Sequence, residues 1–168
     1  RLGISLLRAP NAGCCGAVTF HLDQQEQALA AMRRNIDAWW PYVEQGVEAI
    51  VFTASGCGTM ITDYGHALAA DPGYAERAKR ISAMACDLST VIDKEKSKLK
   101  QLLTSNLPSE TIAFHPPCSL QHGLKLKGHV EALLTELGFK LAPVSDAHLC
   151  CGSAGTYSIL QPEISAQL

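Results

Sequence analysis

Cysteine is the residue type whose number and spacing could do chemistry in this sequence. Four of the seven cysteines form two adjacent pairs, each followed by glycine: Cys14-Cys15-Gly16 and Cys150-Cys151-Gly152. An odd number leaves one cysteine over in any disulfide framework, and neighbouring cysteines cannot bridge each other without strain. Because thiolates are preferred ligands of zinc and of iron–sulfur clusters, the cysteines favour metal or redox chemistry in a reducing compartment over structural disulfides.

The two Cys-Cys-Gly elements form a weak internal repeat, which indicates two related halves. Glycine beside each pair lets the backbone approach a bulky inorganic centre and leaves amide N–H groups free to donate to sulfur. Cys57 and Cys118 each follow a short apolar segment, and 31 residues separate Cys118 from Cys150. Such spacing differs from the tight Cys-x-x-Cys pairs of a zinc ribbon, so a preformed fold must assemble any site from separate loops.

Short apolar segments alternate with longer segments of helical periodicity along the chain. We expect strands at residues 4–7, 48–53, 111–114 and 139–144, and helices at 23–45, from near 59, at 74–103, at 120–137 and after 155. This order predicts an α/β fold with a mainly parallel sheet or sheets flanked by helices. Because sites in such folds gather beyond the carboxyl ends of the strands, we expect the four cysteine-bearing loops to share one edge of the sheet.

Composition narrows the classes of protein that the chain can belong to. Of its 168 residues, 47% are apolar and 18% are charged, with a net charge of −2. Without a basic excess the sequence does not predict a nucleic-acid partner, and no apolar run is long enough to cross a bilayer. The start at Arg1 and the end inside a helix-like segment lead us to expect a fragment of a longer protein, in which targeting signals are not observable.

The cysteine motifs and their flanking residues resemble those of the cysteine-rich "CCG" domain. That domain occurs in heterodisulfide reductase subunits, in lactate-utilisation proteins and in the iron–sulfur subunit of glycolate oxidase. The segments that are most similar to the last of these are Gly13-Cys14-Cys15-Gly16-Ala17, Thr53-Ala54-Ser55-Gly56-Cys57-Gly58, Pro117-Cys118-Ser119-Leu120-Gln121-His122 and His148-Leu149-Cys150-Cys151-Gly152-Ser153-Ala154-Gly155-Thr156-Tyr157. The resemblance covers essentially the whole chain.

The resemblance implies four ligand cysteines in each half, namely a leading cysteine, the Cys-Cys pair and a trailing cysteine. Three match in residues 1–108 and three match in residues 109–168; they are Cys14, Cys15 and Cys57, and Cys118, Cys150 and Cys151. The first half lacks its leading cysteine and the second lacks its trailing one, so we expect the fragment alone to be apo or to hold adventitious metal. Cys57 is followed by Gly58-Thr59-Met60, so the Cys-x-x-Cys ending of the heterodisulfide reductase form is absent.

The resemblance also implies a function. It points to the iron–sulfur subunit of an oxidase (dehydrogenase) complex that converts glycolate to glyoxylate, with a flavin on partner subunits and a membrane quinone as a candidate acceptor. The cofactor would be an iron–sulfur cluster, expected to be 4Fe-4S, and the thiolates would hold it. We expect no catalytic side chain, no autonomous activity from the fragment, and a cytoplasmic location that can be peripheral at the inner face of the cytoplasmic membrane.

Two other functions fit the cysteines, namely a structural zinc module and a thiol–disulfide redox protein with a low-pKa cysteine. His115, His122 and His148 lie near the cysteine motifs and could ligate metal or donate an N–H group to a cluster sulfur; we favour such a role for His115 and His148. Cys86 lies inside the expected helix 74–103 without a motif, so we expect it to act as a small buried hydrophobic residue.

Overall fold

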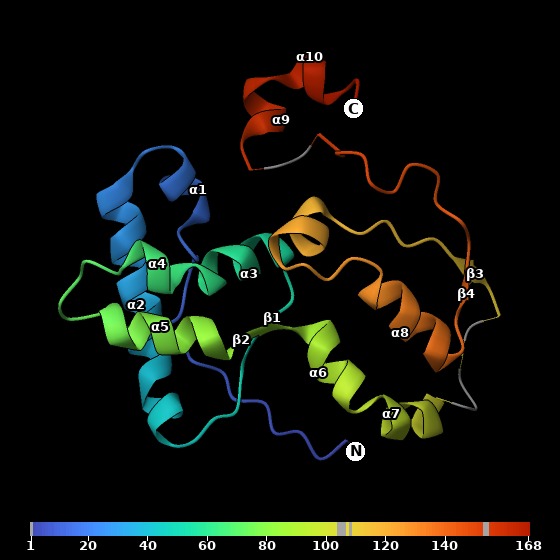
Figure 1. Ribbon diagram of the computed structural model, residues 1–168, viewed down its shortest axis with the longest axis horizontal. Coiled ribbons are helices and arrows are strands. Elements are labelled where there is room, and N and C mark those ends of the chain that lie inside the picture. The colour runs from blue at the N-terminus through green and yellow to red at the C-terminus, as the bar shows by residue number, and fades with distance from the viewer. Residues whose placement is uncertain (1, 104–106, 108, 153–154) are drawn as a thin grey trace. The chain divides into compact units, whose positions relative to one another are not determined.

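The computed structural model describes residues 2–103, 107, 109–152 and 155–168. The chain forms two compact units, residues 3–88 and residues 89–168, and Figure 1 shows the elements of both. The α/β class expected from the sequence is confirmed, because each unit combines helices with a pair of parallel strands. The boundary that we placed at residues 108 and 109 falls partly outside the described residues, and it stays a prediction.

The first unit is built around a long amphipathic helix and one strand pair. Its elements are α1 (Ala17–His21), α2 (Gln25–Glu44), β1 (Ile50–Phe52), α3 (Ser55–Thr62), α4 (Tyr64–Ala67), α5 (Ala75–Met84) and β2 (Ala85–Asp87). The expected helix 23–45 is confirmed as α2, whose Ala28, Met32 and Ile36 are fully buried at a spacing of four. This spacing places them on one helix face, which packs on the unit's core together with Tyr64 and Ile81.

The second unit consists of short elements joined by longer loops. They are α6 (Leu88–Lys94), α7 (Lys96–Leu103), β3 (Thr111–Ile112), η1 (Ser119–Gly123, a π-helical turn), α8 (His129–Leu137), β4 (Lys140–Leu141), α9 (Tyr157–Leu160) and α10 (Pro162–Ser165).

Among the described residues of the whole chain, no helix combines the length and the apolar character that crossing a membrane requires.

The structure corrects the expected positions of two segments in the first unit. Residues 4–7 form no strand, and Leu6 is 84% exposed, because their local β-propensity finds no partner strand. Cys86 lies in β2 opposite Val51 of β1 and not in a helix. Pairing with β1 therefore overrides the helical periodicity of residues 74–103, which the structure divides into α5, β2, α6 and α7.

Two further expectations are corrected by backbone geometry and sheet topology. The expected helix 120–137 is interrupted between η1 and α8, where Lys125 and Gly128 have left-handed φ values of 59° and 74°; this conformation cannot continue an α-helix. The parallel strands form two separate two-stranded sheets, β1–β2 and β3–β4. The four cysteine loops therefore do not follow one sheet, and the expectation of a single shared edge is wrong.

Candidate functional site

The first unit brings Cys14, Cys15 and Cys57 together. Cys14 and Cys15 precede α1, and Cys57 lies in the first turn of α3, directly after β1. Cys14 and Cys57 are exposed, whereas Cys15 is 6% exposed and its thiol is hydrogen-bonded with that of Cys57. Burial, together with the neighbouring Cys57 and Cys14 sulfurs, raises the pKa of Cys15 to about 11, although the N–H of Ala17 bonds to its sulfur and acts in the opposite direction.

The backbone of the Cys14–Cys15 loop is held by side chains of two helices. Asn35 of α2 accepts a hydrogen bond from the Gly13 N–H at 2.7 Å and donates to the Cys14 carbonyl at 2.9 Å. Tyr64 of α4 donates from its hydroxyl to the Cys15 carbonyl at 2.8 Å. Both side chains are fully buried, so the polar groups of the loop are satisfied by the protein interior and not by solvent.

Two glycines allow the cysteine segments of the first unit to pack closely against neighbouring residues. Gly16 has a φ of +85°, and a Cβ there would lie 3.0 Å from the carbonyl oxygen of Ala28, so the loop packs directly on α2. A Cβ at Gly58, next to Cys57, would overlap the ring of Phe52. These contacts explain why glycine accompanies both cysteine segments of the first unit.

The second unit brings Cys118, Cys150 and Cys151 together. Cys118 is half-buried at the start of η1, while Cys150 and Cys151 are exposed in the loop that follows β4. Burial raises the pKa of Cys118, and the neighbouring Cys150 and Cys151 sulfurs add to this effect; the Cys118 and Cys150 thiols are also hydrogen-bonded. The N–H of Gly152 donates to Cys150 Sγ at 3.4 Å, as expected for glycine beside a metal-binding thiol.

A buried glutamine ties the cysteine segments of the second unit together. Gln121, three residues after Cys118, donates from Nε2 to the Pro116 carbonyl at 2.8 Å and to the Ala147 carbonyl at 2.9 Å. Gly152 is buried with a φ of +72°, and its carbonyl accepts a hydrogen bond from the Ser165 hydroxyl. Ser153 and Ala154, which belong to the expected motif, lie outside the described residues.

The donor set fits an iron–sulfur cluster in kind, because each unit gathers three thiols, and burial together with the neighbouring sulfurs raises the pKa of one thiol in each unit, Cys15 and Cys118. Thiolates on separate loops are the usual ligands of such clusters. Within the described residues, no group of three or more Cys, His, Asp or Glu side chains already has metal-binding geometry. The sulfurs would therefore have to move on loading, and each unit supplies three of the four thiolates that a four-cysteine site needs.

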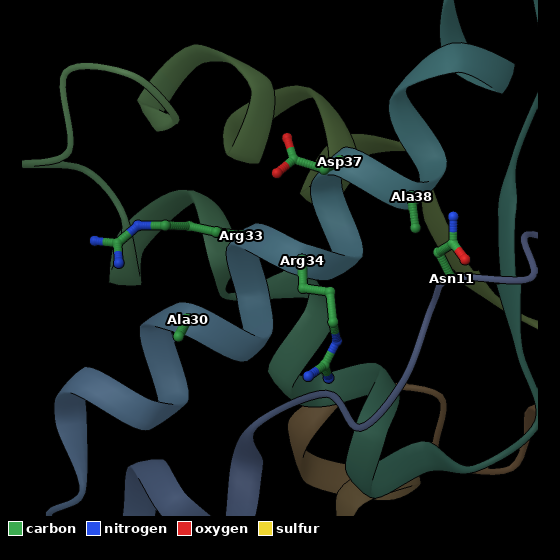
Figure 2. Close-up of a pocket in the computed structure, with 6 residues that line it drawn as sticks. All are labelled: Asn11, Ala30, Arg33, Arg34, Asp37 and Ala38. Carbon is green, nitrogen blue, oxygen red and sulfur yellow. The ribbon is translucent and has the colours of Figure 1, made fainter.

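A shallow hollow of about 480 Å³ lies beside the first cysteine loop, and its lining residues are Asn11, Ala30, Arg33, Arg34, Asp37 and Ala38. Figure 2 shows the Arg34 and Asp37 side chains extending away from each other. Arg33 pairs with Asp71 at 2.7 Å and Asp37 pairs with Arg77 at 2.9 Å. Arg33 and Asp37 are thus paired within the protein, and Arg34 donates to the Cys14 carbonyl at 3.4 Å.

The remaining candidates from the sequence are three histidines, and no contact in the described part of the chain joins them to the cysteine triplets. His115, His122 and His148 are exposed, and a role for them towards a metal stays a prediction. Sequence reasoning missed Asn35, Tyr64 and Gln121, which hold the cysteine loops. A signal for Asn35 was present, because a polar residue occupies the buried face of α2 between Met32 and Ile36.

Comparison with known proteins agrees with the cysteine geometry. A family model described as the CCG cysteine-rich domain matches residues 1–62 and 112–168, and these two ranges contain the two cysteine triplets. The chain therefore belongs to the CCG cysteine-rich domain family, which confirms the resemblance stated from the sequence. No solved structure matches the chain.

Individual relatives are similar over the whole chain. It is 51% identical over 168 residues to the glycolate oxidase iron-sulfur subunit of Escherichia coli (strain K12), of which it covers 40%. It is 27% identical over 167 residues to the probable glycolate oxidase iron-sulfur subunit of Bacillus subtilis (strain 168), covering 36%, and 27% identical over 172 residues to lactate utilization protein A of Geobacillus thermodenitrificans, covering 67%. The chain thus spans about two fifths of the length of the first two relatives.

Proposed function

We propose that this chain is the cysteine-rich part of the iron–sulfur subunit of a glycolate oxidase, and that its two cysteine triplets hold iron–sulfur clusters of the 4Fe-4S type. The observation that carries the proposal is the separation of the six motif cysteines into two triplets, each gathered by its own unit. The identity of 51% to a glycolate oxidase iron-sulfur subunit supports the particular complex.

In this function the residues of the chain bind the cluster and set its environment. A bound cluster supplies one-electron redox chemistry whose potential depends on burial and on hydrogen bonds to sulfur. The N–H groups of Ala17 and Gly152 donate to Cys15 and Cys150, and burial of Cys15 excludes water from one sulfur. Each triplet needs one further thiolate, which we propose comes from outside residues 1–168.

The wider complex follows from the same proposal. A flavin on partner subunits takes the hydride from glycolate, and the iron–sulfur subunit passes single electrons to an acceptor such as a membrane quinone. We place the subunit in the cytoplasm, peripheral to the inner face of the cytoplasmic membrane. Residues 1–168 alone then have no enzymatic activity.

The test is metal and sulfide analysis of the full-length subunit prepared without air. We expect iron and acid-labile sulfide in the wild type, and loss of one cluster's content in either Cys15→Ser or Cys118→Ser. Cys86→Ser is the matched control, because Cys86 lies in β2 and belongs to neither triplet; it should retain the wild-type content. Zinc without sulfide in the wild type would instead establish the structural zinc module.

The raised pKa values of Cys15 and Cys118 favour metal binding over thiol–disulfide catalysis. A catalytic cysteine needs a thiolate near neutral pH and therefore a lowered pKa. In the metal-free form both thiols are held protonated by burial and by neighbouring sulfurs. A positively charged metal centre reverses that balance, because it stabilises the thiolates that the apo protein disfavours.

A further inference from the structure

The Cys-Cys-Gly loops make few backbone hydrogen bonds of their own. Around the first loop, the described backbone bonds join Ala12 to Ala9 and Phe20 to Gly16. The polar groups between them, the Gly13 N–H and the Cys14 and Cys15 carbonyls, are bound by side chains from other elements. The conformation of this loop is therefore set by residues distant in sequence and not by a regular turn.

Asn35 can satisfy both the donor and the acceptor of this loop because its side chain is a carboxamide, which accepts at one atom and donates at another. The Gly13 N–H can only donate and the Cys14 carbonyl can only accept, so Oδ1 must face Gly13 and Nδ2 must face Cys14. The second Nδ2 proton is donated to the Tyr64 hydroxyl oxygen at 3.1 Å. A carboxylate of the same shape would present oxygen to the Cys14 carbonyl and would lose both donated bonds.

Tyr64 extends this hydrogen-bond network towards the segment that carries Cys57. Its hydroxyl accepts from Asn35 and donates to the Cys15 carbonyl, while its ring is stacked on Trp39 of α2 at 6.3 Å between ring centroids. Tyr64 begins α4, directly after α3, which carries Cys57. One fully buried pair of side chains thus connects the Cys14–Cys15 loop with the helical segment of its partner cysteine.

In the second unit, Gln121 of η1 connects the two cysteine segments in the same way. It is 5% exposed in η1, and both of its donated bonds go to backbone carbonyls. One bond reaches Pro116 on the Cys118 side, and the other reaches Ala147, three residues before Cys150. Each unit therefore uses one buried carboxamide to fix the distance between its two cysteine segments.

We propose that Asn35 with Tyr64 in the first unit, and Gln121 in the second unit, are positioning residues that hold the cysteine loops in their cluster-binding conformation. The proposal rests on the proposed function for its cluster-binding part. The side chains do not touch the sulfurs; they bind the backbone that carries them. Removing one of their hydrogen bonds should loosen one loop and leave the remainder of that unit folded.

The first test uses the variant Tyr64→Phe, which removes only the hydroxyl and keeps the aromatic ring against Trp39. Hydrogen exchange of the full-length protein, followed by mass spectrometry of peptides, should show at least about fivefold faster exchange at residues 13–17, since the bond that the hydroxyl donates to the Cys15 carbonyl contributes on the order of 1 kcal/mol. Tyr74→Phe is the matched control, because the Tyr74 hydroxyl bonds to Asp37 in the same unit and not to the loop. Equal exchange at residues 13–17 in Tyr64→Phe and wild type overturns the positioning role.

Asn35→Asp and Gln121→Leu serve as controls for each other. Asn35→Asp should accelerate exchange at residues 13–17 and leave residues 143–152 at the wild-type rate, and Gln121→Leu should do the reverse. A uniform increase over both segments would indicate general loss of stability and would count against the proposal. If Asn35→Asp fails to fold, the Tyr64→Phe result decides the first unit.

The second test is the reduction potential of the cluster in the anaerobic full-length subunit. Tyr64→Phe should shift the midpoint potential or the electron paramagnetic resonance signal, with a melting temperature lowered by only a few degrees, and Tyr74→Phe should change neither the potential nor the signal. Iron and sulfide in wild type with identical potentials in both variants overturns the positioning role alone. A wild type without iron and sulfide overturns the proposed function, and the exchange result then judges the positioning of the loops independently.

Discussion

Cys15 in the first unit is 6% exposed, whereas Cys150 and Cys151 in the second unit are both exposed. The first pair lies against α2 and is held by the fully buried Asn35 and Tyr64. The second pair lies in a long loop. The second cysteine of the same three-residue motif is therefore sheltered in one unit and open in the other, while the first cysteine is exposed in both.

The two pairs also differ in which sulfur receives a backbone hydrogen bond. In the first unit the Ala17 N–H bonds to Cys15, the second cysteine of its pair, and in the second unit the Gly152 N–H bonds to Cys150, the first of its pair. In both cases the donor lies two residues after the sulfur. The comparison teaches that the motif supplies the cysteines, while the surrounding fold decides the burial and the hydrogen bonds of each sulfur.

The largest expected effect tests whether the first site depends on close packing. Gly58→Ala places a Cβ inside the ring of Phe52, and overpacking of this kind costs about 3 kcal/mol. The free energy of unfolding, measured with denaturant, should fall by that amount. Gly56→Ala in the same helix meets no atom within 4 Å and should change it little; equal losses in the two variants would contradict the packing argument.

The next effect concerns thiol reactivity in the metal-free protein. Because burial and neighbouring sulfurs raise the pKa of Cys15 from 9.0 to about 11, its thiolate fraction at neutral pH is about a hundredfold below that of an ordinary thiol. Alkylation of Cys15, followed by mass spectrometry, should be slower than that of a cysteine in a short unstructured peptide by a similar factor and should keep accelerating with pH up to about 11. In denaturant the difference should vanish, and a fast Cys15 in the folded protein would remove the contrast between sheltered and open sites.

A smaller effect is expected from the glycine of the second motif. At Gly152→Ala the new Cβ meets the carbonyl oxygen of Ser165 at 2.5 Å, and the residue has a φ of +72°. Gly155→Ala shares a positive φ of +54° but meets nothing within 4 Å, so it controls for backbone strain. We expect Gly152→Ala to destabilise the protein by about 1 kcal/mol more than the control, less than Gly58→Ala because exposed α10 can shift. An effect as large as that of Gly58→Ala would show that the second site is equally tightly packed.

The smallest effects come from the ion pair of Asp71 in the first unit and the two ion pairs of Lys96 in the second, and they have opposite pH dependence. Arg33 holds the pKa of Asp71 below its usual value, so this pair stabilises the folded state above about pH 4, and its contribution is lost as the pH falls through the lowered pKa. Glu136 and Asp93 raise the pKa of Lys96, so the Lys96 pairs stabilise the folded state below about pH 10.4, and their contribution is lost as the pH rises through the raised pKa. Solvent screens all of these pairs.

The variants Asp71→Asn and Lys96→Met separate these two contributions. The pH dependence of the unfolding free energy should flatten only at the acid end in Asp71→Asn and only at the alkaline end in Lys96→Met. Salt should reduce both differences. A change at the wrong end of the pH range would show that other groups dominate the titration.

The sequence could predict the cysteine motifs of the two units and the long helix, because both depend on local patterns. The helical spacing of Leu29, Met32, Ile36, Trp39 and Val43 predicts α2, and the Cys-Cys-Gly repeat predicts two related halves. The motif also grouped Cys57 and Cys118 with the correct pairs, as the structure brings them together. These signals require no knowledge of distant contacts.

Other features could not be predicted because they depend on pairing between distant segments. Residues 4–7 and residues 85–87 are both short and rich in apolar residues, yet only the second pairs with a strand, which places Cys86 opposite Val51. The roles of Tyr64 and Gln121 depend on a carbonyl 49 residues away and a carbonyl 26 residues away. No local spacing encodes such contacts, which form only when the tertiary fold is complete.

The distance along the chain between Cys15 and Tyr64 has a consequence for how the protein matures in the cell. Cys14 and Cys15 leave the ribosome before the 49 residues that lead to Tyr64. Synthesis of those 49 residues takes on the order of several seconds. During that interval the thiols have neither their supporting helix nor Cys57. The nascent pair is then open to oxidation or to unwanted metals, so insertion of a cluster must wait for translation of at least the first unit.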